Sequence, residues 1–259
     1  MTLIVRKEID GVKRYVHLGT GNYNTETSRI YTDIGLFTSD EEICADVSEI
    51  FNYLTGYSAQ SNFRKLLVAP VNLRQKFLDL IEREIKNIKS GGKGHLIFKL
   101  NALVDPVLIT ALYEASRQGV EIDLIVRGNC CLIPQAIGLS ENIRVISIVG
   151  RYLEHNRIYY FFNNGIDEIY CGSADLMQRN LDRRVEIVFP IQNYEMKRFL
   201  KEQILDICLK DNVNSRILLP AGKYVRNHPV YTEKEISLHD KMMKRTDVNT
   251  KKILPKEIP

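Results

Sequence analysis

The stretch HLIFKLNALVDPVLITALYEASRQGVEIDLIVRG, residues 95–128, indicates the fold most directly. Within it, His95–Leu100 and Glu121–Val126 are apolar runs with the length and composition of buried strands. Between them, Asp105 precedes a proline, which is typical of a helix N-terminus, and Gly119 stops the helix. Strand, helix and strand in this order predict a βαβ unit whose parallel sheet is covered on both faces.

Further elements are expected on either side of this unit. Before it, we expect a hairpin of Thr2–Glu8 and Lys13–Leu18, a strand over Arg29–Phe37, a helix from a Ser39–Glu42 capping box to Leu54, a short strand over Leu66–Ala69, and a long helix capped by Asn72 and ended by Gly91. After it, we expect strands over Arg144–Val149, Arg157–Phe162, Glu168–Cys171 and Val185–Pro190, and a closing helix over Glu195–Leu209. Together they predict an α/β protein.

The same pattern suggests how the chain divides. We expect a boundary near Asn62, which separates an incomplete first unit (1–62) from a complete second one (63–222). The Lys-rich, poorly periodic segment 223–259 is interpreted as a mobile or partner-dependent tail. Because the chain begins directly on a strand, it is equally well explained as a piece of a longer protein.

Composition excludes several classes of function. The 259 residues carry a net charge of only +4, which does not argue for nucleic acid as a partner. No run of 18 apolar residues is present, and the charged N-terminus MTLIVRKEIDG does not resemble a signal peptide. Five cysteines without a CxxC pair favour buried thiols in a reducing compartment, so we expect a cytoplasmic protein with no structural zinc site.

A first candidate site is the segment Tyr15–Asn24, YVHLGTGNYN. Glycine and asparagine after a strand let backbone amides turn toward an anion, and a threonine hydroxyl adds a donor. The alternative is a glycine-rich turn beside an incidental histidine, His17, because such loops are common.

A second candidate combines His155 and Arg157 with Ser173 and Asp175. Two positions apart on a strand, His155 and Arg157 face the same side, and the small-residue turn after the next strand can bring the hydroxyl and carboxylate to that edge. An imidazole, a guanidinium and a carboxylate in one pocket suit phosphoryl chemistry. A surface hairpin with a solvated His–Glu pair is the alternative.

A third candidate is Arg127, which follows the strand Glu121–Val126. The C-terminal ends of parallel strands are where α/β sheets place their ligands, and a guanidinium holds phosphate oxygens with two hydrogen bonds. A structural Arg–Asp pair is the alternative. Lys99 and Asn101, at the end of the preceding strand, are weaker phosphate-binding candidates of the same kind.

Taken together, these blocks resemble the C-terminal half of bacterial polyphosphate kinase, the histidine-phosphorylating type. The matching stretches are HLGTGNYN (17–24), SRIYTD (28–33), KLNALVD (99–105), DLIVRGNCCLIP (123–134), NIRVISIVGRYLEHNRIYYF (142–161) and YCGSADLMQRNLDRRVE (170–186), in the order of the family. The resemblance implies two phospholipase D-like domains, a partial one over 1–62 and a complete one over 63–222, each a mixed sheet flanked by helices. It places the active site in the cleft between them.

The resemblance also implies an activity and its residues. The family reversibly transfers the terminal phosphate of ATP to polyphosphate through a phosphohistidine, with Mg²⁺ accompanying ATP. Tyr31, Arg127 and His155 match residues that hold the nucleotide, and His155 is the expected acid–base partner of the phosphohistidine. ATP or ADP and polyphosphate are thus the expected partners, and the family associates into homo-oligomers.

One departure from the family concerns the nucleophile. The phosphorylated histidine of the family lies in a His-Ala-Lys triplet just before the segment that matches Met1–Ile4, so this chain does not contain it, and His17 does not inherit its role. The Mg²⁺-associated arginines of the family also lie upstream, so no metal site is expected here. We therefore expect a fragment that is inactive alone. The alternatives are a phospholipase D-like phosphodiesterase, disfavoured by His155-x-Arg157 in place of His-x-Lys, and a non-catalytic polyphosphate-binding module.

Overall fold

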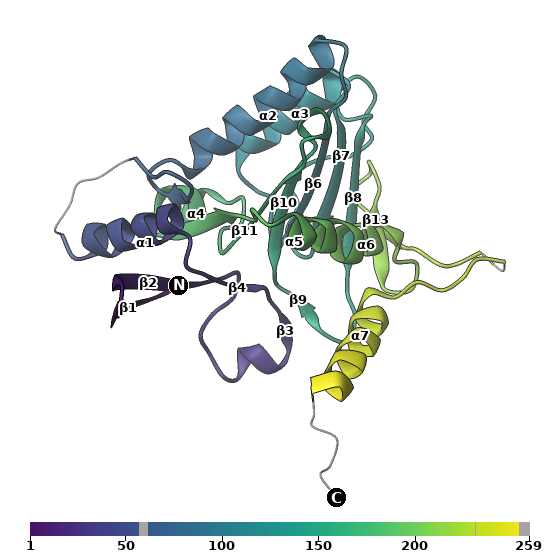
Figure 1. The fold of residues 1–259 in the computed structure, drawn as a ribbon. Helices are drawn as coiled ribbons and strands as arrows, with labels where there is room; N and C mark the ends of the chain where they lie inside the picture. The colour runs from purple at the N-terminus through teal and green to yellow at the C-terminus, as the bar shows by residue number, and fades with distance from the viewer. Residues whose placement is uncertain (57–61, 231, 254–259) are drawn as a thin grey trace, which may run out of the picture.

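A nine-stranded sheet organises the chain in this computed structural model, which describes residues 1–56, 62–230 and 232–253 (Figure 1). In spatial order its strands are β14 (Tyr224–Arg226), β13 (Ser215–Leu218), β8 (Ile143–Ile148), β7 (Glu121–Val126), β6 (His95–Leu100), β10 (Arg157–Phe161), β11 (Glu168–Gly172), β12 (Glu186–Pro190) and β5 (Leu67–Ala69). Strands β6, β7 and β8 pair in parallel, and the remaining neighbours are antiparallel. The predicted βαβ unit and mixed sheet are confirmed.

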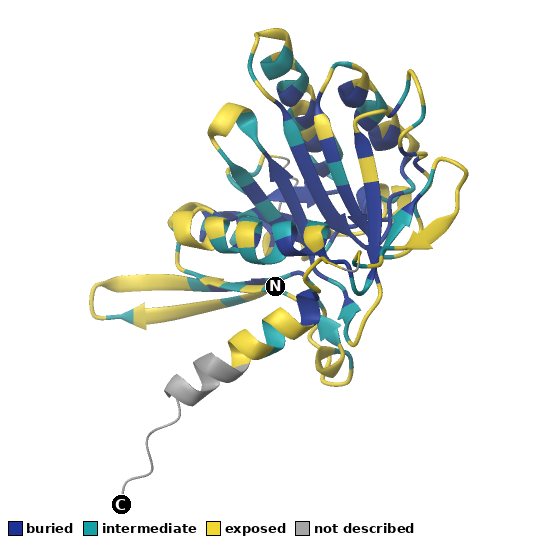
Figure 2. Cartoon of the chain, turned by 90° about the vertical axis from the view of Figure 1, so that its right-hand side faces the viewer, coloured by how far each residue is buried: buried dark blue, intermediate teal, exposed yellow. Residues whose placement is uncertain are grey.

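Helices cover both faces of this sheet (Figure 1). The helices are α1 (Glu41–Leu54), α2 (Leu73–Lys89), α3 (Pro106–Arg117), α4 (Gln178–Asp182), α5 (Tyr194–Phe199), α6 (Asp206–Lys210) and α7 (Leu238–Ile253), with 3₁₀ turns η1 (Thr27–Arg29) and η2 (Asn163–Gly165) and a π-helical segment η3 (Leu200–Leu205). One apolar cluster lies between the sheet and α2 and α3, and a second joins the opposite face to α1, η3 and α6. The central strands of the sheet are therefore mostly buried, whereas the edge strand β14 is exposed (Figure 2).

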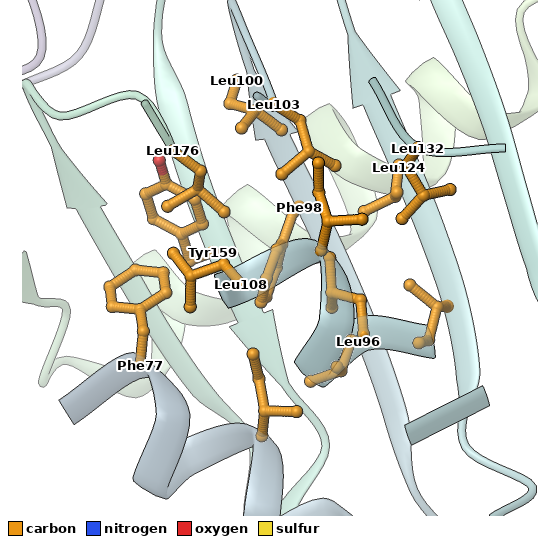
Figure 3. Packing of buried hydrophobic residues seen from close by; sticks show 14 of the residues in the cluster. Phe77, Leu96, Phe98, Leu100, Leu103, Leu108, Leu124, Leu132, Tyr159 and Leu176 are labelled. Atoms are coloured by element: carbon orange, nitrogen blue, oxygen red, sulfur yellow. The ribbon is translucent and has the colours of Figure 1, made fainter. Parts of the chain in front are cut away.

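Alternation along the strands assigns side chains to the two clusters. On β6, Leu96, Phe98 and Leu100 point toward α2 and α3, whereas Ile97 belongs to the other cluster. Phe77 of α2 meets Phe98 and Tyr159 edge to face, with ring centroids 6.0 and 4.7 Å apart (Figure 3). A strand that is buried on both faces must be apolar at nearly every position, which explains its continuous apolar sequence.

The first unit forms one small sheet of its own and contributes one strand to a second small sheet. Strands β1 (Thr2–Glu8), β2 (Gly11–Gly19) and β4 (Gly35–Thr38) form an antiparallel sheet, and β3 (Tyr31–Thr32) pairs with β9 (Leu153–Glu154). The predicted hairpin is confirmed, but the predicted single strand over Arg29–Phe37 is wrong. It is divided into η1, β3 and β4 because the chain turns at Asp33, whose carboxylate makes contacts described below.

Two predicted helix caps differ from the structure. Asp40 rather than Ser39 caps α1, since its carboxylate accepts a hydrogen bond from the Ile43 N–H at 2.9 Å. Asn72 stands at the start of α2, but its side chain does not cap the helix. It accepts a hydrogen bond from the N–H of Val68 on β5 instead. The cap predicted at Asp105 is confirmed by its bond from the Leu108 N–H at 3.0 Å.

The segment from 223 onward contains regular elements within the residues that the structure describes, and its interpretation as a mobile or partner-dependent tail stays a prediction. Strand β14 pairs with β13, and the carboxylate of Asp211 accepts a hydrogen bond from the N–H of Leu238, where α7 begins. Leu238 and His239 are buried. Hydrogen bonds between distant polar groups hold this region, and such bonds leave no periodic signal in the sequence. Residues 231 and 254–259 lie outside the described part.

Asp46 fastens the first unit to the second. Its carboxylate is fully buried on α1 and accepts hydrogen bonds from the backbone N–H groups of Arg64, Lys65 and Leu66, at 2.7–3.0 Å. These three residues lead directly into β5 of the large sheet. The first unit is thus held against the second by buried hydrogen bonds.

Candidate functional site

The pairing of β3 with β9 brings the first unit to the end of the large sheet. Tyr31 lies opposite Leu153, and Thr32 lies opposite Glu154. The Thr32 hydroxyl accepts a hydrogen bond from the N–H of His155 at 3.3 Å and donates to the carbonyl of Leu153. Residues about 120 positions apart in the sequence therefore meet around His155.

His155 and Asp33 form a hydrogen-bonded pair in this junction. The Nδ1 atom of His155 lies 2.9 and 3.0 Å from the two carboxylate oxygens of Asp33, and the ring of Tyr31 packs on the imidazole with centroids 4.7 Å apart. A carboxylate at this position selects the tautomer that carries hydrogen on Nδ1 and orients the ring. The Nε2 atom then faces the guanidinium of Arg157.

The glycine-rich segment after β2 serves this carboxylate. The Thr20 hydroxyl donates to Asp33 at 2.7 Å, and a Cβ atom at Gly21 would lie only 2.0 Å from an Asp33 oxygen, so only glycine fits there. The Thr20 N–H donates to the carbonyl of Ile34 and is not directed at an anion. The predicted anion cradle is thus a support for Asp33, while His17 bonds Tyr23.

Arg157 lies against the imidazole and is neutralised by Asp175. Its guanidinium binds the Asp175 carboxylate through Nε at 3.3 Å and Nη2 at 2.9 Å, and Nη1 lies 3.3 Å from Nε2 of His155. Nη1 also donates to the carbonyls of Thr20 and His155. Both charged side chains are less than a tenth exposed. The predicted grouping of His155, Arg157 and Asp175 therefore exists in the structure.

Arg127 is the half-buried cation of the cluster that has no acidic partner among the described residues. Its Nε atom is buried without a hydrogen-bond partner there, and it forms no ion pair within that part of the chain. Burial lowers the pKa of Arg127, and the positive charge of nearby Arg157 lowers it further. Asp123 is not the partner of such a structural Arg–Asp pair, because it lies within β7 and binds His95 and Arg144, toward the N-terminal ends of the parallel strands.

Three weaker candidates have different surroundings. Asn101 belongs to the cluster, since its Nδ2 donates to the carbonyl of His155 at 3.2 Å while its buried Oδ1 has no partner among the described residues. The Lys99 ammonium is buried 2.7 Å from a carboxylate oxygen of Glu154. The Ser173 hydroxyl donates to Glu186 and accepts from the Ile187 N–H. The structure does not bring Lys99 or Ser173 to the imidazole.

A cavity of about 610 Å³ opens beside Asp33. Apart from Asp33, Glu154 and a few other polar groups, its walls are apolar and come from β4, α5, η3 and α7; they include Leu36, Phe37, Met196, Phe199, Leu200, Ile204 and Met242. An apolar cavity suits an apolar ligand or segment.

Two family models cover most of the chain. The model described as polyphosphate kinase C-terminal domain 1 matches residues 1–60, and the model described as polyphosphate kinase C-terminal domain 2 matches residues 66–238. The chain belongs to the polyphosphate kinase family. The cluster around His155 takes residues from both matched regions. Tyr31 and Asp33 lie in the region that matches domain 1, and His155 lies in the region that matches domain 2.

Individual polyphosphate kinases give the same result. The chain is 52% identical to the polyphosphate kinase of Thermosynechococcus vestitus over 244 residues, which are 94% of this chain and 33% of that protein. It is 49% identical to the polyphosphate kinase of Bacillus cereus over 250 residues, 96% of this chain and 35% of that protein. The crystal structure of polyphosphate kinase from Porphyromonas gingivalis superposes with a TM-score of 0.88 at 38% identity, covering 93% of this chain and 37% of that one. The chain thus spans about a third of these relatives.

Sequence reasoning assigned no role to Asp33 or Glu154, although both stand in the stretches that match polyphosphate kinase. Asp33 lies two residues after Tyr31, and nothing in the local pattern says that its carboxylate meets an imidazole 122 positions away. The alternative to the second candidate site places Glu154 in a solvated pair with His155 at the surface. In the structure it is buried between Lys99 and His239, at 2.7 and 2.6 Å, so that alternative is wrong.

Acid is expected to weaken this buried network. Burial alone would raise the pKa of Glu154, but Lys99 and the hydrogen bond with His239 lower it to about 2, from an ordinary value of 4.5. A carboxyl group with a lowered pKa stabilises the fold above pH 4.5 and loses that contribution as the pH falls toward 2. The contribution is about 3 kcal/mol when complete.

The measurement is urea unfolding of wild type and Glu154→Gln between pH 6 and pH 2.5. The stability difference between the two proteins should shrink as the pH falls, because only the wild type takes up a proton at this site. A difference that stays constant over this range would contradict the assignment.

Proposed function

We propose that this chain forms the nucleotide- and phosphate-handling part of a polyphosphate kinase, which reversibly transfers the terminal phosphate of ATP to inorganic polyphosphate. The observation that carries the proposal is the junction of β3 with β9, which places Tyr31, Asp33, His155 and Arg157 together at the C-terminal ends of the parallel strands. Such strand ends are where open α/β sheets bind ligands. Membership of the family supports the choice of reaction.

In this proposal His155 is the acid–base group. Asp33 holds Nδ1–H, so Nε2 can give a proton to the leaving oxygen of the nucleotide and take it back in the reverse direction. Asp33 also stabilises the imidazolium form while the proton is on the ring. The aromatic ring of Tyr31 bounds the space over the imidazole and offers a face for the adenine base.

The two arginines handle the phosphate charge. Arg157 is already balanced by Asp175, so we assign it to orienting the imidazole, which its Nη1 atom approaches to 3.3 Å. Arg127 has no acidic partner among the described residues, and a phosphate oxygen would satisfy its buried Nε and compensate its desolvated charge. We assign Arg127 to the nucleotide phosphates on this basis.

The nucleophile and the metal are proposed to come from outside this chain. A phosphohistidine that precedes residue 1 would accept the phosphate as a P–N bond forms and a P–O bond breaks, and polyphosphate would then take the phosphate from it. Mg²⁺ would enter bound to ATP as part of the substrate. The described residues include no group of three His, Cys, Asp or Glu side chains that could hold a metal, so we assign no step to a metal held here.

Arg127→Ala tests the assignment. In a complete polyphosphate kinase that contains this chain, the variant should raise the KM for ATP roughly 10- to 100-fold, since a hydrogen bond to a charged group contributes about 1.5–3 kcal/mol. Initial rates of polyphosphate formation at varied ATP give KM and kcat. Arg127→Lys should recover part of the loss, because it keeps the charge without the two-pronged geometry.

Arg144→Ala is the matched control. Arg144 is a guanidinium on β8, toward the N-terminal ends of the parallel strands, where it binds Asp123 at 2.8 Å. Its removal should leave the KM for ATP unchanged. Equal effects of the two alanine variants, or none from Arg127→Ala, would remove Arg127 from the nucleotide site.

Three further expectations remain predictions. We propose that the complete protein is a homo-oligomer that acts in the cytoplasm and does not bind nucleic acid. Among the residues that the structure describes, no helix combines the length and apolar character needed to cross a membrane. Sedimentation of the complete protein tests the oligomer.

A further inference from the structure

A buried network of three ionisable side chains connects the C-terminal helix to the site. Glu154 lies between the ammonium of Lys99 at 2.7 Å and Nε2 of His239 at 2.6 Å. All three side chains are at most 4% exposed. They come from β6, β9 and α7, which are distant in sequence, and Figure 1 shows α7 next to β9. Charged groups are rarely buried so completely unless each has a partner.

The network touches the segment that carries His155. Glu154 immediately precedes His155, and the strand β9 to which it belongs pairs with the Tyr31 strand. The imidazole of His239 also packs against Gly150, where a Cβ atom would lie 2.5 Å from its Nδ1 atom. Position 150 must therefore be glycine for His239 to enter. In the turn before His155, Gly150, Tyr152 and Glu154 thus all contact His239.

The hydrogen bonds of His239 define its direction. The Tyr152 N–H points to Nδ1 at 3.5 Å, while Nε2 meets the carboxylate of Glu154. The ring of Tyr152 packs edge to face on the imidazole at 5.5 Å. One side chain from α7 thus contacts both Tyr152 and Glu154, and loss of its ring would remove one hydrogen bond from each end of the three-residue segment that leads into His155.

We propose that His239 is a positioning residue of the phosphate-transfer site: through Glu154 and Tyr152 it holds the 150–155 turn, and thereby the imidazole of His155 against Asp33. The helix α7 is then part of the support of the site. The consequence for catalysis rests on the proposed function, whereas the consequence for His155 itself does not. His239 makes no contact with the reacting groups; it acts through the backbone.

His239→Ala in the complete kinase should lower kcat roughly 10- to 100-fold, because a displacement of about 1 Å in a catalytic group has an effect of this size. The KM for ATP should change less than about threefold, since Arg127, which directly follows β7, does not depend on the 150–155 turn. His239→Gln should recover most of kcat, because its amide can still donate to Glu154. A purely structural role would predict neither a loss confined to kcat in His239→Ala nor the recovery of kcat in His239→Gln.

Two variants serve as controls. Leu238→Ala removes buried packing at the start of α7 and leaves the His239 hydrogen bonds in place, and His228→Ala removes an exposed histidine before the same helix. Leu238→Ala should lower stability but leave kcat within about twofold of wild type at a temperature where both proteins are folded. If Leu238→Ala and His239→Ala reduce kcat equally, the helix acts only by general stabilisation and the proposal is wrong.

A second measurement separates this inference from the proposed function. Nitrogen-15 NMR of His155 in the 259-residue chain reports its tautomer without any turnover. In wild type the spectrum should show hydrogen on Nδ1, and in His239→Ala it should show a mixture of the two tautomers. An unchanged His155 spectrum would overturn the positioning role even if the kinase assignment holds. A changed spectrum in a complete protein without kinase activity would retain the positioning role and reject the proposed function.

Discussion

His155→Ala is expected to reduce polyphosphate synthesis about 10²- to 10⁴-fold in a complete polyphosphate kinase that contains this chain, which is the range that a positioned acid–base group contributes. The imidazole is held by Asp33 through Nδ1 and lies beside Arg157, so its Nε2 is the group available for proton transfer. The loss should appear in the forward and reverse reactions alike, because the same proton is given and returned. Initial rates of both reactions measure it.

Asp33→Asn should reproduce much of this loss while the imidazole stays in place. An asparagine amide can present N–H donors to Nδ1, which favours the tautomer with hydrogen on Nε2 and leaves that atom unable to accept a proton. A reduction of about 10²-fold or more in kcat is therefore expected, with the free energy of unfolding little changed, since Asp33 is partly exposed.

His17→Ala provides the matched control for both variants. His17 also bonds an oxygen, the Tyr23 hydroxyl at 2.6 Å, and it stacks on Phe37, but it does not contact the cluster around His155. It should retain nearly full activity. If His17→Ala is as damaging as His155→Ala, or if His155→Ala keeps the wild-type rate, the acid–base assignment is wrong.

Asp175→Ala is expected to lower the free energy of unfolding of the chain by about 3–5 kcal/mol, the usual cost of removing one partner from a buried ion pair. The Asp175 carboxylate binds Arg157 and also accepts hydrogen bonds from the backbone N–H groups of Asn101 and Ala102, at 2.6 and 3.2 Å. Its loss leaves a buried guanidinium and two buried N–H groups without their acceptor. Urea unfolding of the isolated chain measures the effect.

Two further variants define what this loss means. Asp182→Ala removes a carboxylate that is 50% exposed and pairs with Arg74 at the surface. This change should lower the free energy of unfolding by less than about 1 kcal/mol. The double variant Asp175→Ala/Arg157→Met should lose less free energy of unfolding than the two single variants lose together, because it removes the uncompensated charge. Additive effects, or an Asp175→Ala cost as small as that of Asp182→Ala, would contradict the buried pairing.

Local patterns in the sequence were sufficient for most of the fold. The apolar runs of β6 and β7, with the Asp105 cap between them, predict the βαβ unit correctly because buried parallel strands and helix caps are encoded within a few residues. The strand predicted over Arg29–Phe37 fails because β3 ends at Thr32 and the next residue, Asp33, bonds His155, a contact that leaves no period in the sequence. The described part after 223 is also held by polar contacts without a period, those of Asp211 and His239.

For the site, the sequence by itself determined which chemical groups are present and, through resemblance, which family they belong to: an imidazole at 155, guanidinium groups at 127 and 157, and a tyrosine at 31. Only the tertiary structure decided their partners. Hydrogen bonding and charge compensation act over about 3 Å in space, so the pairing of Asp33 with His155 across 122 positions cannot be inferred from either segment alone. For the same reason Lys99, which its position at a strand end made a phosphate candidate, instead lies buried beside Glu154.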